Sequence, residues 1–144
     1  MNEQAIPKWQ PIGKLSLVRR QIDGMLETAN QQRAWLQQAQ AKTHVLDDST
    51  LRWVIDVFTI QKKDLWLFDE QLYQWRAEKL TMSQRAEIEL LTRQMRYLHE
   101  AVNAILTLAD ELKEDTIEKV LEKGDAKRGL EMLVQLWKHE QKEF

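Results

Sequence analysis

Cysteine is absent from this chain of 144 residues, and proline and glycine are scarce. Without cysteine there is no disulfide, no thiolate metal site and no cysteine nucleophile, which agrees with a reducing compartment. Both prolines lie before residue 12 and only four glycines are present, so few turn signals interrupt the chain from Leu15 onward. This scarcity favours long helices.

Long apolar runs and an excess of basic residues are also missing. No stretch of about 18 apolar residues occurs, and residues 1–7 lack the basic start and apolar stretch of a secretory signal. The formal net charge is −2, whereas domains that neutralise phosphates usually carry a basic excess. We therefore expect a cytoplasmic protein of one domain, residues 1–144, with no membrane span and no nucleic-acid partner.

Three long segments show apolar residues at alternating steps of three and four, which is typical of amphipathic helices. These stripes cover residues 15–39, 51–75 and 88–112. Residues 1–13 contain both prolines and are expected to form an extended lead segment. Short connections make sequential helices antiparallel, so residues 14–113 are expected to form an up-down-up bundle of three long helices.

Two sequences of the capping-box type mark expected helix starts. Thr81 and Gln84 precede the third stripe. Asp115 and Glu118 repeat the pattern and predict a new short helix, followed after Gly124 by another. The expected fold is therefore all-α, with a three-helix body and a short C-terminal helical hairpin over residues 115–140.

The second and third helices carry more apolar surface than one three-helix contact needs. Each has a further apolar row: Trp53, Val57, Ile60 and Leu67 in the second helix, and Leu90, Tyr97, Ala101, Ala104 and Leu108 in the third. Large uncovered apolar patches usually mark interfaces, and a two-fold homodimer is the commonest way to cover them. The alternative is a monomer in which the C-terminal hairpin and the Trp9 segment fold over both rows.

Six tryptophans supply further candidates for partner contacts, because tryptophan is enriched at interface hot spots. Tryptophan at helical spacing also fills cores, so both interpretations stay open. The segment around Trp9 has the same two options, since it can dock into another protein or fold onto its own bundle. The predicted partner-binding residues are Trp9, Trp35, Trp53, Val57, Ile60, Trp66 and Tyr97.

Polar residues interrupt the stripes near the middle of the expected bundle. Antiparallel pairing places Gln32 of the first helix, Gln61 of the second and His99 of the third in neighbouring layers. Such a layer is either a binding site for a small ligand or a hydrogen-bonded layer that fixes helix register. The second interpretation is the commoner one in helical bundles.

Catalytic and cofactor chemistry have little support in the sequence. None of the three histidines has a carboxylate three residues before it, which is the pattern of di-iron bundles. Glu111, Glu114 and Glu118 have the spacing of an acidic magnesium site, but such spacing is common in solvated helix ends. We therefore expect no metal, no cofactor and no enzyme.

The leading hypothesis is a non-enzymatic helical module for protein–protein interaction, an adaptor or oligomeric regulator, that works as a homodimer or with another protein. The first alternative is a small-molecule sensor with a pocket at Gln32, Gln61 and His99. The second alternative is a metal-dependent phosphohydrolase with the acidic site described above.

Overall fold

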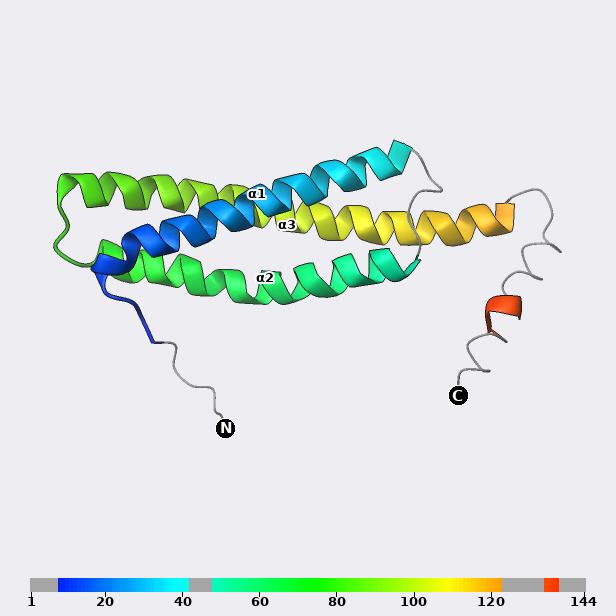
Figure 1. The fold of residues 1–144 in the computed structure, drawn as a ribbon, viewed down its shortest axis with the longest axis horizontal. Helices are drawn as coiled ribbons and strands as arrows, with labels where there is room; N and C mark the ends of the chain where they lie inside the picture. Colours follow the sequence, from blue (N-terminus) through cyan, green and yellow to red (C-terminus); the bar gives the residue numbers. More distant parts are fainter. Residues whose placement is uncertain (1–7, 42–47, 123–133, 138–144) are drawn as a thin grey trace.

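The structure is a computed structural model that describes residues 8–41, 48–122 and 134–137 (Figure 1). The elements in chain order are a 3₁₀ turn η1 (Ile12–Lys14), α1 (Leu15–Ala41), α2 (Asp48–Arg76) and α3 (Met82–Glu122). Residues 134–137 are also helical, and the described residues contain no strand. The predicted all-α class is confirmed.

The three long helices lie side by side, with α1 and α3 running in one direction and α2 in the other (Figure 1). Helix α3 packs against both α1 and α2 along its length, whereas α1 and α2 approach each other far less. Polar contacts agree with this arrangement, since Arg19 near the start of α1 reaches Glu87 near the start of α3 at 3.1 Å. Helix α3 is therefore the central element of the bundle.

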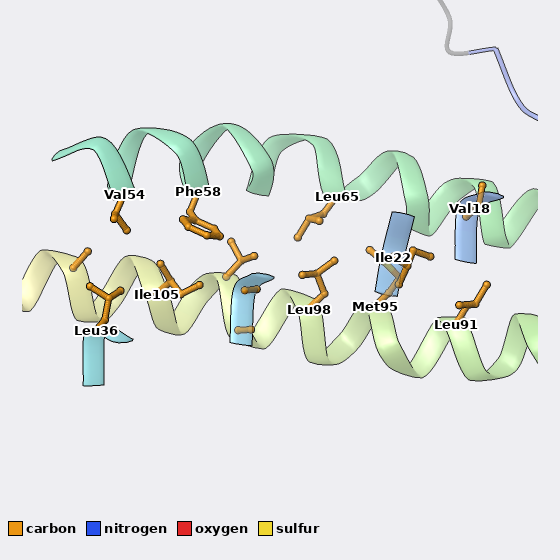
Figure 2. Close-up of a cluster of buried hydrophobic side chains, with 14 of the residues drawn as sticks. Val18, Ile22, Leu36, Val54, Phe58, Leu65, Leu91, Met95, Leu98 and Ile105 are labelled. Atoms are coloured by element: carbon orange, nitrogen blue, oxygen red, sulfur yellow. The ribbon is translucent and has the colours of Figure 1, made fainter. Parts of the chain in front are cut away.

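The core consists of the predicted stripes. Figure 2 shows Val54, Phe58 and Leu65 of α2 facing α3, and every residue of the α3 stripe is buried: Ile88, Leu91, Met95, Leu98, Val102, Ile105, Ala109 and Leu112. Each fully buried leucine contributes about 1.5–3 kcal/mol to folding by leaving water. The hydrophobic effect along these stripes therefore fixes the register of the three helices.

The connection between α2 and α3 is fixed by the predicted capping box. The Gln84 backbone N–H donates to Thr81 Oγ1 at 3.0 Å, and the Thr81 N–H donates to Gln84 Oε1 at 3.0 Å. Two backbone donors that the first turn of α3 leaves free are thereby satisfied. The predicted start of the third helix is confirmed.

The predicted end of the third helix near residue 113 is wrong, because α3 continues to Glu122. Asp115 and Glu118 lie inside α3 rather than at the start of a new helix. Residues three apart are neighbours on a continuous helix as well as in a capping box, so their spacing alone does not mark a break. The rest of the predicted hairpin, apart from helical residues 134–137, lies outside the described residues.

None of the helices that the structure describes is both long enough and apolar enough to cross a membrane.

Candidate protein-interaction surfaces

An open groove of about 590 Å³ separates α1 from α2. Phe58 and Phe68 of α2 and Met25 of α1 line its apolar part, and Gln61 and Thr28 add uncharged polar groups. Phe58 is buried, whereas Phe68 and Met25 are only partly buried. The groove exists because α3 spaces α1 and α2 apart, which leaves their facing side chains without close packing.

Exposed apolar side chains border this groove on the α2 side. Val57 lines it, and Trp53 and Ile60 lie four residues before and three residues after Val57, on the same face of the helix. Trp53 is 59% exposed and Ile60 is 62% exposed, so both place large apolar surfaces in water. Trp53 and Ile60 of the predicted second row are therefore uncovered by the described residues, whereas Val57 and Leu67 are partly buried.

Trp35 extends the same surface from the α1 side. Trp35 lies seven residues after Thr28 on α1, and Trp53 lies four residues before Val57 on α2. Thr28 and Val57 both line the groove. Since α1 and α2 run in opposite directions, Trp35 and Trp53 continue the groove toward the same end of the bundle. We call Met25, Trp35, Trp53, Val57 and Ile60 the α1/α2 face.

Two other predicted partner-binding residues lie on different surfaces. Trp66 lines a second groove of about 490 Å³ between α2 and α3, together with Asp69, Tyr73, Arg76 and Thr92. Tyr97 is exposed on α3. The predicted set is thus divided between separate faces of the bundle and does not form one surface.

The lead segment is bound to the bundle through Trp9 and Gln10. The rings of Trp9 and Trp66 meet edge to face, with centroids 6.5 Å apart and planes at 81°. The Gln10 N–H donates to Gln71 Oε1 at 2.6 Å, and the Gln10 carbonyl accepts from Gln71 Nε2 at 3.3 Å and from Trp75 Nε1 at 2.8 Å. Of the two interpretations of the Trp9 segment, the structure shows the intramolecular one.

Gln71 is a site residue that sequence reasoning missed. It is 6% exposed and is the buried polar residue of the described core. Its carboxamide partners the backbone of a residue 61 positions away, and nothing in its own helix indicates such a distant partner. The only available signal was its position four residues before Trp75, because residues at that spacing share one helix face.

The predicted polar layer of Gln32, Gln61 and His99 does not form one pocket. Gln61 lines the groove between α1 and α2, whereas His99 Nε2 lies 2.7 Å from Asp69 Oδ2, a residue of the groove between α2 and α3. Gln32 Oε1 is buried without a partner in the structure. The three side chains therefore have separate surroundings.

The acidic residues of the second alternative, the metal-dependent phosphohydrolase, lie near the end of α3. Glu111 and Glu114 are exposed, and the side chain of Glu118 lies outside the described set. Where the structure describes side chains, no three histidine, aspartate or glutamate residues are grouped so as to hold a metal ion.

Comparison of the chain with protein-family models, with curated proteins and with solved structures finds no match.

Proposed function

We propose that this protein is a non-enzymatic helical module for protein–protein interaction, an adaptor or oligomeric regulator that works through the α1/α2 face. The observation that carries the proposal is the high exposure of Trp53 and Ile60, 59% and 62%, beside an open apolar groove. Exposed apolar residues are ordinary when single, but contiguous apolar patches mark interaction surfaces.

The energy available at this face favours an interface role. A tryptophan side chain buries roughly 150–250 Å² in a packed contact, and Trp53 retains more than half of its surface in water. At about 25 cal/mol per Å², covering the exposed part of Trp53 alone contributes about 2–4 kcal/mol to association. Tryptophan is also enriched among the residues that dominate binding energy.

A second copy of the chain is the partner that we propose for this face. In a two-fold pair the same surface faces itself, so the tryptophans and Ile60 of one copy meet those of the other. The groove lining includes one charged residue, Arg20, and exposed Asp64 lies on the same side of α2 four residues after Ile60, so pairing the face with itself buries few charges. The proposed assembly is therefore a symmetric homodimer.

The experiment is light scattering on a size-exclusion column at two protein concentrations, first with the native chain and then with Trp53→Glu. We expect the mass of two chains for the native protein and of one chain for the variant, because the new carboxylate loses water on pairing. Met82→Glu is the matched control, since Met82 is 90% exposed and lies at the start of α3, away from this face. A Trp53→Glu mass equal to the native mass, with circular dichroism unchanged, contradicts the proposal.

A small-molecule sensor remains the second candidate, supported by the buried and unpaired Oε1 of Gln32. Buried acceptors without partners are rare, and each needs an explanation such as a bound molecule. A thermal-shift screen against metabolites and nucleotides tests this function, since a ligand that binds only the folded state raises the melting temperature. If a broad screen leaves the melting temperature unchanged, this candidate loses its support.

A further inference from the structure

We infer that Trp66, Gln71 and Trp75 of α2 form a recognition site for an extended peptide that carries a tryptophan, with the chain's own residues 8–11 as internal ligand. This site includes none of the residues of the α1/α2 face, and the space beside it shares Gln21 and Phe68 with the lining of the groove between α1 and α2. It lies where the lead segment meets α2, and the same chemistry would accept such a segment from another polypeptide.

Gln71 binds the backbone of residue 10 and not its side chain. Its carboxamide oxygen accepts from the Gln10 N–H at 2.6 Å and its carboxamide nitrogen donates to the Gln10 carbonyl at 3.3 Å. This paired contact reproduces the hydrogen bonding that a neighbouring β-strand gives to an extended chain. The residue at position 10 is itself exposed, so its side chain is free to vary.

The site binds a polar backbone group within apolar surroundings. Gln71 is 6% exposed and Trp75 is fully buried, yet both direct polar atoms at one carbonyl, the carbonyl of Gln10. A buried carboxamide or indole N–H without a partner destabilises a fold. The side-chain donors of these two residues therefore find their hydrogen-bond acceptor in a bound peptide group and not in their own helix.

Trp66 gives the site its preference for tryptophan. The residue before the recognised backbone group is Trp9, whose ring meets the Trp66 ring edge to face at 6.5 Å. Such ring pairs stabilise a contact beyond the burial of area alone. Pro11 follows the recognised residue and restricts it to extended conformations, so the segment loses little entropy on binding.

Open space adjoins the bound segment. About 230 Å³ lies between residues 8–10, α1 and α2, next to Gln71, and is lined by Trp9, Val18, Leu67 and Phe68 among others. Residues 9 and 10 make three hydrogen bonds and one ring contact with α2, and Ile12 of η1 packs partly buried against the core. A competing segment therefore has to replace the polar contacts of Gln10 and the ring contact of Trp9.

The experiment uses the full chain with Trp9→Ala and Gln10→Pro combined. Proline at position 10 has no N–H to donate to Gln71, and alanine at position 9 removes the ring that meets Trp66, so the internal ligand is weakened while every helix is kept. The probe is a capped peptide with the sequence of residues 8–13. Binding is followed by the indole N–H signals in heteronuclear NMR, Trp75 and Trp66 being the residues that report on the site.

We expect the probe to bind the double variant at least tenfold more tightly than the native chain, whose own segment competes for the site. A control peptide with proline in place of Gln10 is expected to bind at least tenfold more weakly than the probe. A receptor that also carries Gln71→Met, which keeps the shape of the side chain but removes its polar atoms, should lose the difference between the two peptides.

Equal binding of the two peptides, or indole signals that do not move at millimolar probe, overturns the inference and leaves residues 8–11 as a structural clasp. If the double variant fails to fold, as judged by circular dichroism, Trp9→Ala alone replaces it with the same two peptides. The mass of the protein on the sizing column is a separate readout, because the peptide site does not include Trp53 or Ile60.

Discussion

The two sides of α2 differ in how completely the neighbouring helix covers them. On the side facing α3, long stripes of buried side chains interdigitate, and the rim carries polar pairs such as His99 with Asp69 at 2.7 Å and Arg76 with Thr92 at 2.7 Å. On the side facing α1, partly buried residues line an open groove bordered by Trp53 and Ile60. Both sides of α2 therefore carry an open groove, but only the side facing α3 has a continuous buried contact beneath it.

This difference shows that a helix with apolar residues on two faces does not need to bury both within its own chain. The stripe of α2 that faces α3 makes most of the packing contacts between α2 and the other helices. The second row of α2 is therefore available for another molecule, which is why we assign the interaction function to it.

The largest expected effect tests whether the α3 contact carries the stability. Leu98 is fully buried, so Leu98→Ala should lower the free energy of unfolding by about 3 kcal/mol, from lost transfer energy and the cavity left behind. Met25→Ala in the groove should cost about 1 kcal/mol, because Met25 is only partly buried. Urea unfolding followed by circular dichroism measures both, and equal losses would remove the distinction between the two sides.

The second prediction concerns the connection that holds α2 and α3 together. Thr81→Ala removes the side-chain acceptor for the Gln84 N–H and should lower the free energy of unfolding by about 1 kcal/mol. Thr81→Ser keeps the hydroxyl and serves as the control, with a loss well below that of alanine. The same urea titration measures both variants, and a neutral Thr81→Ala would show that the capping box contributes nothing.

The third prediction asks whether the groove is open in solution. A methyl group added at Gly24, in α1 beside the groove, meets no atom within 4 Å. Gly24→Ala should therefore raise the free energy of unfolding by about 0.5–1 kcal/mol through helix propensity. The measurement is thermal unfolding at a concentration where the protein is monomeric, and a loss of stability there would mean that the groove is closed.

The smallest effect is expected on the rim between α2 and α3. Asp69→Asn and His99→Ala should each change the free energy of unfolding by about 0.5 kcal/mol or less, because both side chains are about two-fifths exposed, 44% and 40%. A double-mutant cycle measured by urea unfolding isolates the coupling between them. A coupling well above 1 kcal/mol would show that polar contacts, and not packing, close this side.

The sequence was sufficient to predict the buried stripes because helical periodicity is a local property. Every residue of the expected α3 stripe is buried, and the Thr81–Gln84 capping box formed as predicted. The end of α3 was missed because a cap and a helix interior use the same spacing at Asp115 and Glu118. A local sequence pattern therefore predicts which residues a helix buries more accurately than it predicts where the helix ends.

The candidate site was less predictable because it depends on contacts between distant segments. The second row of α2 was identified by its apolar residues. That Trp66 lies on another surface could be seen only once the positions of α1 and α3 around α2 were known. Gln71 and His99 have partners 61 and 30 residues away, and no local pattern identifies such partners. Hydrogen bonds between residues distant in the sequence can therefore be identified only from the folded structure.

The bond between Gln10 and Gln71 also has a consequence for the order of folding. It joins residues 61 positions apart, so it closes a loop that includes all of α1 and most of α2. Closing this loop costs conformational entropy, and the bond can offset that cost only after α3 has brought the two helices together. Docking of the lead segment is therefore expected to be the last folding event and the first to reverse, with amide exchange at Gln10 faster than in the buried turns of α3.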